Sequence, residues 1–171
     1  MALAIVEEYY TIKDYEQWEG DWELIKGKPY AMAPAPFNKH QWITGKVAFL
    51  LNLKFRKCKK CFVLAEAEYR ISEDTVLRPD VSVICEPLGK YIKNPPLIIF
   101  EIISSSTKLR DEITKKEIYK LQKVPFYVLI YPDNEIKMLN LATNEELEKI
   151  TLNTPCGEIE ITKDEILEEI V

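Results

Sequence analysis

The sequence predicts an α/β or α+β fold in which helices flank a mixed central sheet of about five to seven strands. Residues 96–104 (PLIIFEIIS) form a nearly continuous β-branched apolar run, which is typical of a central strand buried on both faces. Residues 38–57 instead repeat apolar side chains at helical spacing. This second pattern predicts a long helix, with Asn38 as its expected N-cap, packed against the sheet.

Caps, turn residues and local alternation define the remaining elements. The other expected helices cover residues 12–19, about 107–123, and 163 to the C-terminus. The other expected strands cover residues 22–26, 29–32, 62–71, 79–85, 126–131 and 135–141, with one or two short strands in the tail.

Length and composition indicate one folded domain. A chain of 171 residues that is 47% hydrophobic can bury a substantial core. We expect residues 1–171 to form a single domain, with 145–171 as an acidic C-terminal extension of it. The longest apolar runs, such as 126–131, have six residues and are far too short to span a bilayer, and the N-terminus lacks the basic segment of a signal peptide. We therefore expect a cytoplasmic protein without a membrane anchor.

Charge is distributed unevenly along the chain. The net charge of −5 combines −6 over residues 1–23, −7 over 145–171 and +8 over 24–144. The acidic total disfavours a protein that coats nucleic acid non-specifically, whereas the basic middle allows a local surface for a polyanion.

A run of basic residues lies at the end of the expected long helix. It consists of Lys54, Arg56, Lys57, Lys59 and Lys60. One interpretation is a cationic helix C-terminus that complements the helix dipole. The other is a nucleic-acid-binding patch that contacts phosphates, whose binding would weaken as the salt concentration rises.

The cysteines and the single histidine narrow the range of metal sites. Cys58 and Cys61 have the spacing of zinc ligands, but Cys85 and Cys156 do not form a second such pair. We expect buried or inert thiols rather than zinc ligands. His40 alone excludes a site built from several histidines.

Glu101 is the strongest indication of chemistry in the sequence. It interrupts the apolar strand 96–104, where an ionised carboxylate is costly unless an opposite charge compensates it. Two interpretations stay open at this residue. One is a salt bridge that holds a helix to the sheet, and the other is a carboxylate that binds a metal ion.

Asp80 favours the metal interpretation. It opens the expected strand 79–85 directly after Pro79, and this strand would place it beside Glu101 if the two strands are neighbours. Two carboxylates within about 5 Å raise a pKa unless a cation lies between them. A hard cation such as Mg²⁺ binds one or two protein carboxylates together with substrate phosphates. Taken alone, Asp80 could instead cap a turn.

A third set of residues lies on the helix expected after the Glu101 strand. Asp111, Lys115 and Tyr119 recur four residues apart and therefore share one helix face. The first two could form a surface ion pair worth about 0.3–0.5 kcal/mol. Alternatively, the Lys115 ammonium lies over the carboxylate pair, where it would stabilise phosphate charge or help position an attacking water.

In combination these segments resemble the Uma2 (Uma-two) family of restriction-endonuclease-like proteins, within the PD-(D/E)XK nuclease superfamily. The matching stretches are WELIKGKPYAM (22–32), NKHQW (38–42), RPDVSVI (78–84), PPLIIFEIISSST (95–107), DEITKKEIY (111–119) and VPFYVLIYPD (124–133). They follow the family's order and span about 110 residues. The resemblance implies a restriction-endonuclease-like fold and a Mg²⁺-dependent phosphodiesterase site.

The resemblance also implies roles for particular residues. Asp80 and Glu101 match the two metal-binding acids, and Lys115 matches a lysine that the family carries on the following helix. The general superfamily pattern has this lysine two residues after the acid, where this chain has Ile103. Glu23 matches an acid that such nucleases bring in from their first helix–strand region.

Four further residues are secondary candidates. Asp111 and Tyr119 match the helix face that accompanies the lysine. His40 matches a histidine near the start of the long helix, where it could contact substrate, orient water, or serve as a capping or packing residue. Glu68 lies on a strand that could face the cleft. The family usually has an SPST-like turn where this chain has SSST at 104–107, which changes the rigidity of the turn without abolishing metal binding.

We therefore expect a Mg²⁺-dependent endonuclease, in which Mn²⁺ can replace Mg²⁺, acting on nucleic acid and in the first place on DNA. The expected catalytic residues are Asp80, Glu101, Lys115 and Glu23, with the first two as metal ligands. A homodimer is expected because duplex cleavage needs two sites. One alternative is a nuclease-fold binding or accessory module with little or no hydrolysis. Another is a structural domain with a buried ion triad of Asp80, Lys115 and Glu101.

Overall fold

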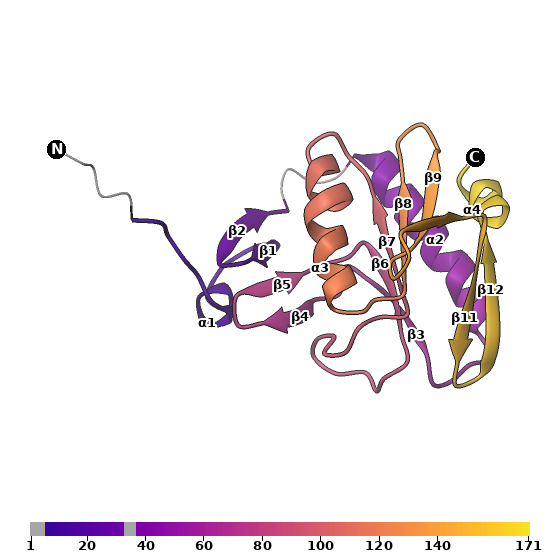
Figure 1. Cartoon of the computed structure of the whole chain (residues 1–171), viewed down its shortest axis with the longest axis horizontal. Coiled ribbons are helices and arrows are strands. Elements are labelled where there is room, and N and C mark those ends of the chain that lie inside the picture. The colour runs from indigo at the N-terminus through magenta and orange to yellow at the C-terminus, as the bar shows by residue number, and fades with distance from the viewer. Residues whose placement is uncertain (1–5, 33–36) are drawn as a thin grey trace.

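The computed structural model describes residues 6–32 and 37–171. In these ranges the chain has the predicted α+β architecture, with few helices and more than one sheet (Figure 1). A six-stranded mixed sheet forms the centre of the molecule. A four-stranded sheet lies on its N-terminal side, and a two-stranded hairpin lies toward the C-terminus.

The boundaries of the elements follow the sequence closely in most places. The strands are β1 (Trp22–Ile25), β2 (Lys28–Ala31), β3 (Phe62–Ala65), β4 (Tyr69–Ser72), β5 (Thr75–Leu77), β6 (Val81–Ile84), β7 (Ile98–Ile102), β8 (Phe126–Ile130), β9 (Ile136–Asn140), β10 (Glu145–Leu147), β11 (Lys149–Thr154) and β12 (Gly157–Thr162). The helices are α1 (Ile12–Tyr15), α2 (Asn38–Phe55), the π-helix η1 (Arg110–Lys115), α3 (Lys116–Leu121) and α4 (Lys163–Ile170).

The central sheet has the strand order β10-β9-β8-β7-β6-β3. Strands β7 and β8 pair in parallel, and the other neighbouring strands pair antiparallel. All five residues of β7 are buried, as expected for the apolar run 96–104. The sheet therefore places the most apolar strand of the chain, together with its single carboxylate, at the centre of the fold.

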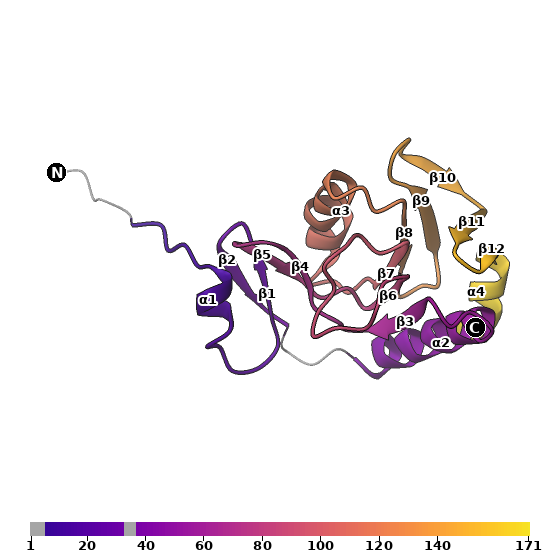
Figure 2. The same cartoon turned by 90° about the horizontal axis from the view of Figure 1, so that it is seen from below.

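The two faces of β7 pack against different helices. Phe100 packs with Leu51 of α2 on one face, whereas Ile99 packs with Tyr119 of α3 on the other. Successive side chains of a strand point to opposite faces, so Glu101 shares the face of Ile99 and lies beneath η1 and α3. Figure 2 shows α2 and α3 on opposite sides of this sheet.

Helix α2 runs along one face of the sheet and is joined to α4 at its side. Ion pairs link Lys54 to Glu165 at 2.6 Å and Lys46 to Glu169 at 3.5 Å. Phe37, rather than the expected Asn38, is the N-cap residue. No helix in the described part of the chain combines the length and the apolar character needed to cross a bilayer.

The expected strand 62–71 is wrong in one respect, because it is two strands in two different sheets. Strand β3 belongs to the six-stranded sheet, whereas β4 belongs to the four-stranded sheet of order β2-β1-β5-β4. The chain changes direction near Glu66, which has a φ of +52°. Glutamate rarely adopts this left-handed conformation, and the local sequence contains no glycine or proline that would have signalled a break.

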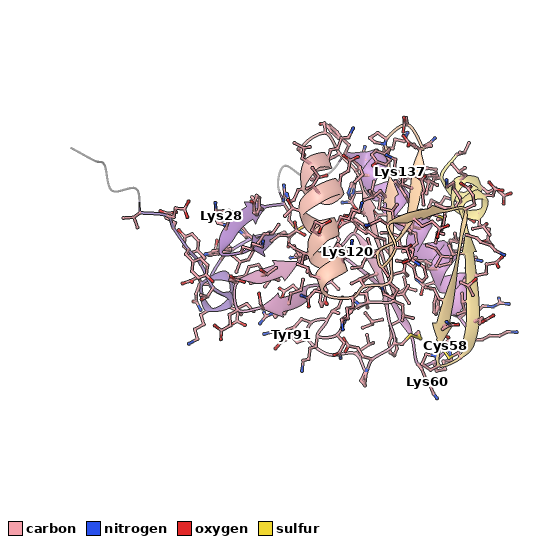
Figure 3. The ribbon with its side chains drawn as sticks, in the orientation of Figure 1. Lys28, Cys58, Lys60, Tyr91, Lys120 and Lys137 are labelled. Atoms are coloured by element: carbon pink, nitrogen blue, oxygen red, sulfur yellow. A yellow bond between two sulfur atoms is a disulfide. The ribbon has the colours of Figure 1, made fainter. Side chains whose placement is uncertain are left out.

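The expectation of free thiols is also wrong. Cys58 forms a disulfide with Cys156, and Cys61 forms one with Cys85. The first links the end of α2 to the turn between β11 and β12, and the second links the start of β3 to the end of β6. The disulfides therefore fasten the end of α2 that lies at the bottom of Figure 3, where Cys58 and Lys60 are labelled.

Candidate active site

Two carboxylates meet where β6 and β7 run side by side. Val81 pairs with Phe100, so the next residues outward, Asp80 and Glu101, lie opposite each other. The Asp80 backbone N–H donates a hydrogen bond to Glu101 Oε2 at 3.3 Å, and the Ile102 N–H donates to Asp80 Oδ2 at 2.7 Å. Both side chains are almost fully buried. The backbone thereby fixes the orientation of both acids.

Lys115 lies among three carboxylates, one of them that of Glu101. Its Nζ is 2.8 Å from Glu23 Oε1, 2.9 Å from Glu101 Oε1 and 3.3 Å from Asp111 Oδ1, and only 5% of its side chain is exposed. The Tyr119 hydroxyl donates to Glu101 Oε1 at 3.1 Å. The residues that the sequence singled out on β1, β7, η1 and α3 therefore converge on the ion pair of Lys115 and Glu101.

The π-helix η1 supports this arrangement. It contains both Asp111 and Lys115, and the Tyr127 hydroxyl donates to the Asp111 carbonyl at 2.9 Å. The Asp111 N–H donates to the Thr107 carbonyl at 2.9 Å. Short π-helical segments occur mostly within α-helices and often at functional sites. Here the widened turn faces Glu101 directly.

Buried negative charge exceeds buried positive charge in this cluster. Burial raises the pKa of Glu101 well above its usual range, although Lys115 opposes the shift. Burial likewise raises the pKa of Asp111. Burial acts to lower the pKa of Lys115, but the carboxylates of Glu101, Glu23 and Asp111 outweigh it and raise that pKa well above its usual value. One ammonium thus serves several carboxylates, and a further cation would stabilise all of them.

The available metal-binding side chains fit an open site for a hard divalent cation better than a closed site made of protein ligands alone. Among the described residues, no group of three or more His, Cys, Asp or Glu side chains is arranged to hold a metal ion. Asp80 and Glu101 offer two carboxylates on the wall of a cavity. Mg²⁺ binds to one or two carboxylates and completes its shell with water and phosphate oxygens. The site therefore suits Mg²⁺ or Mn²⁺, and it does not suit a closed zinc site.

The cavity at these carboxylates has a volume of about 780 Å³. It lies between the four-stranded sheet, the N-terminal end of α2 and the loop that follows β7. Glu23, Asp80, Glu101, Asp111 and Lys115 form its charged wall. A ligand can therefore reach all the principal candidate residues from one opening.

His40 belongs to the same cavity. Its Nε2 is 3.3 Å from Asp80 Oδ2, whereas its Nδ1 is buried without a hydrogen-bond partner. Burial acts to lower the pKa of His40, but the hydrogen bond to Asp80 and the negative charges of nearby carboxylates together outweigh it, so the pKa is raised. His40 and the Ile102 N–H therefore share one oxygen of Asp80, Oδ2.

Glu68 does not join this group. Its carboxylate accepts hydrogen bonds from the Tyr15 hydroxyl at 3.3 Å and from Arg70 Nε at 3.1 Å. Glu66, two residues earlier, lines the cavity instead. The reversal of the chain at Glu66 separates the two acids, which a single strand over 62–71 would have kept on one face.

The basic run expected to bind phosphates lies away from the cavity. Helix α2 spans eighteen residues, or about 27 Å, and separates His40 from this run. Lys54 is engaged by Glu165, and Lys60 lies beside Cys58 at the bottom of Figure 3. The run therefore does not reach a phosphate bound at the carboxylates, and both interpretations of it, a complement to the helix dipole or a patch that contacts more distant phosphates, stay predictions.

Three other cations lie at the cavity instead. Arg78 Nη1 pairs with Asp21 at 2.7 Å, Arg110 Nη1 is 3.5 Å from Glu23 Oε2, and the Lys39 ammonium donates to a backbone carbonyl. All three line the cavity. They come from separate segments, so no charge run marks them. The position of Arg78 directly before Pro79 and Asp80 was the one local signal.

Comparison with known proteins identifies a family and a similar fold. The profile of the Uma2 family, described as "Putative restriction endonuclease", matches residues 6–155. The chain is similar in fold to a crystal structure of a putative nuclease belonging to DUF820 from Anabaena variabilis. The TM-score is 0.74 at 15% sequence identity, and the match covers 94% of this chain and 99% of the other. No curated protein matches.

Proposed function

The chain belongs to the Uma2 family, and we propose that it is a metal-dependent endonuclease that hydrolyses phosphodiester bonds in DNA. The observation that carries the proposal is the pairing of Asp80 with Glu101 on a cavity wall where Lys115 does not balance the buried negative charge. A metal-dependent nuclease uses such carboxylates to hold a cation against the phosphate.

The residues of the chain have separate roles in this proposal. Asp80 and Glu101 hold Mg²⁺ or Mn²⁺, which when bound would lower the pKa of a water and neutralise phosphate oxygens. Lys115 stabilises negative charge that develops on the phosphate. Glu23 assists by fixing Lys115, and His40 and Tyr119 each hold one of the metal-binding carboxylates in place.

Nicking of supercoiled plasmid DNA tests this function. We expect wild-type protein to nick plasmid in Mg²⁺ or Mn²⁺ and to lose this activity in EDTA. Glu101→Gln and Asp80→Asn should each reduce the rate at least about 100-fold, whereas Lys60→Ala, remote from the cavity, should not change it. Activity that survives both carboxylate substitutions would contradict the assignment.

The contacts of Lys115 favour a second candidate, a purely structural ion network. Lys115 pairs with Glu23, Glu101 and Asp111, although the sequence had suggested Asp80 as a member of the triad. A structural network predicts no response of stability to Mg²⁺. A binding module without hydrolysis would instead respond to Mg²⁺ and bind DNA without nicking it.

Compartment and assembly remain predictions. We propose a homodimer on the argument that two strands need two sites, and size-exclusion chromatography with light scattering tests it. A cytoplasmic location is harder to reconcile with Cys58–Cys156 and Cys61–Cys85, because disulfides are rare in that compartment outside hyperthermophiles.

A further inference from the structure

The candidate catalytic groups lie deep in the cavity rather than on an open surface. Glu101 and Glu23 are each 2% exposed, and Lys115 is 4% exposed. A phosphate can reach them only by entering the cavity with its flanking sugar and base. A volume of about 780 Å³ is in the range of pockets that enclose a small-molecule ligand, of roughly 300–1,000 Å³. The cavity is therefore large enough for a whole nucleotide, and larger than a phosphate alone would need.

The cavity also has an apolar part that phosphodiester chemistry does not require. Met32, Phe37 and Pro132 line it beside the charged wall. Phe37 is 80% exposed, although aromatic side chains of this size are usually buried. An exposed aromatic ring next to a phosphate-binding site matches the stacking platforms on which proteins receive unpaired bases.

The cations at the cavity are held by partners that a phosphate could replace. Arg78 pairs with Asp21, whose side chain is 69% exposed, so this ion pair is weak and exchangeable. Arg110 stacks on the Tyr30 ring at 4.7 Å and is 3.5 Å from Glu23, which leaves part of its guanidinium available. These groups offer contacts for phosphates on either side of a bound nucleotide.

We propose that the cavity binds an unpaired DNA strand, with one unstacked nucleotide seated between Phe37 and the carboxylates. This inference rests on the proposed phosphodiester chemistry and specifies its substrate. In a duplex, each phosphate is flanked by stacked and paired bases, so a nucleotide must be extruded before it can enter an enclosed pocket. A single strand, a frayed end or an unpaired bubble avoids that energetic cost.

Fluorescence anisotropy with Ca²⁺ in place of Mg²⁺ tests the inference by binding alone. The probes are a fluorescein-labelled single strand of mixed sequence and the same strand annealed to its complement. We expect the single strand to bind wild-type protein at least about tenfold more tightly. Phe37→Ala should weaken single-strand binding about 5- to 100-fold, the effect of losing one stacked base, with a smaller effect on the duplex.

Two further variants make this result specific. Phe37→Tyr keeps an aromatic ring and should retain single-strand binding. Phe49→Ala removes an exposed aromatic of α2 that does not line the cavity, and it should change nothing. The fold should tolerate Phe37→Ala, because Phe37 holds the start of α2 through its backbone carbonyl, which accepts the His40 N–H at 2.9 Å.

Cleavage of the same two probes in Mg²⁺ separates this inference from the proposed function. Equal binding of both probes, or a duplex cleaved faster than the single strand, would overturn the inference and leave the nuclease proposal standing. A Phe37-dependent preference for the single strand without cleavage of either probe would support the inference and overturn the nuclease proposal. Failure to bind either probe would overturn both.

Discussion

The two ends of helix α2 differ in how their charges are paired and in how firmly they are attached to the rest of the fold. At its N-terminal end, His40 reaches Asp80 in a cluster where carboxylates outnumber the lysine that pairs with them. At its C-terminal end, Lys54 pairs with Glu165, and Cys58 is joined covalently to Cys156. The first end holds buried negative charge that one lysine does not balance, whereas the second is held by an ion pair and a disulfide.

The contrast shows where the fold contains unbalanced buried charge. Buried carboxylates that exceed their cations lower stability, so they persist where a ligand compensates them. The disulfide and the ion pair at the C-terminal end of α2 can offset the loss of stability at the cavity end. If this contrast is correct, substitutions at the cavity should change how Mg²⁺ affects stability, and substitutions at the disulfide-linked end should not.

Removing the shared ammonium should have the largest effect. Lys115→Met leaves Glu23, Glu101 and Asp111 without their buried cation and should lower the free energy of unfolding by about 3–5 kcal/mol. Urea denaturation with and without saturating Mg²⁺ measures this loss, and Mg²⁺ should restore part of it. Lys60→Met is the exposed control, with a change below about 0.5 kcal/mol. If Lys115→Met loses as little stability as this control, the buried carboxylates do not depend on the Lys115 ammonium.

Removing a disulfide should have the next largest effect, at the other end. The double substitution Cys58→Ser and Cys156→Ser opens a link across a sequence separation of 98 residues. It should lower the free energy of unfolding by about 2–5 kcal/mol. Calorimetry should find the Kd for Mg²⁺ unchanged. A weakened Kd would show that the two ends are coupled and that the contrast between them is false.

Glu101→Gln should change stability by only about 1 kcal/mol, and in either direction. The substitution takes one carboxylate from Lys115, but it also removes the repulsion of Glu101 by Asp80, Asp111 and Glu23. Differential scanning fluorimetry should show that Mg²⁺ raises the Tm of wild type and not of this variant. Glu66→Gln, at the cavity without an ion pair in the described residues, is the matched control and should keep the response to Mg²⁺.

The smallest expected effect is on the pH dependence of stability without metal. Burial raises the pKa of Glu101 and Asp111 in the folded state, so the folded protein binds their protons more tightly than the unfolded chain. Stability should therefore fall as the pH rises from about 5 to about 8. Urea denaturation across this range should show a shallower slope for Glu101→Gln. If the slope of stability against pH is the same in Glu101→Gln as in wild type, a group other than Glu101 causes the pH dependence.

Much of the cavity could be predicted because its chemistry stands out locally. Glu101 interrupts an apolar strand, and Asp80 follows a proline that opens the neighbouring strand. Lys115 and Tyr119 follow at helical spacing, which survives the π-helical turn. In each case, the unusual residue and the pattern that makes it unusual lie within a few positions of each other.

The parts that were missed depend on contacts between distant segments. The break at Glu66 requires a left-handed backbone conformation, and the neighbouring sequence has no glycine that would predict it. Lys39, Arg78 and Arg110 line one cavity only after separate segments pack together, whereas the conspicuous run from Lys54 to Lys60 lies at the other end of α2. Clustering in sequence is therefore a poor guide to where a folded chain gathers positive charge.

Calorimetric titration of Mg²⁺ and Mn²⁺ into wild-type protein and Asp80→Asn tests the central claim most directly, because it needs no substrate. We expect saturable binding to wild type that Asp80→Asn abolishes, while circular dichroism shows the fold of the variant intact. Absence of binding to either protein would contradict a metal site at Asp80 and Glu101 and leave Lys115 and its carboxylates as a structural ion network. Equal binding to both would place the metal away from Asp80.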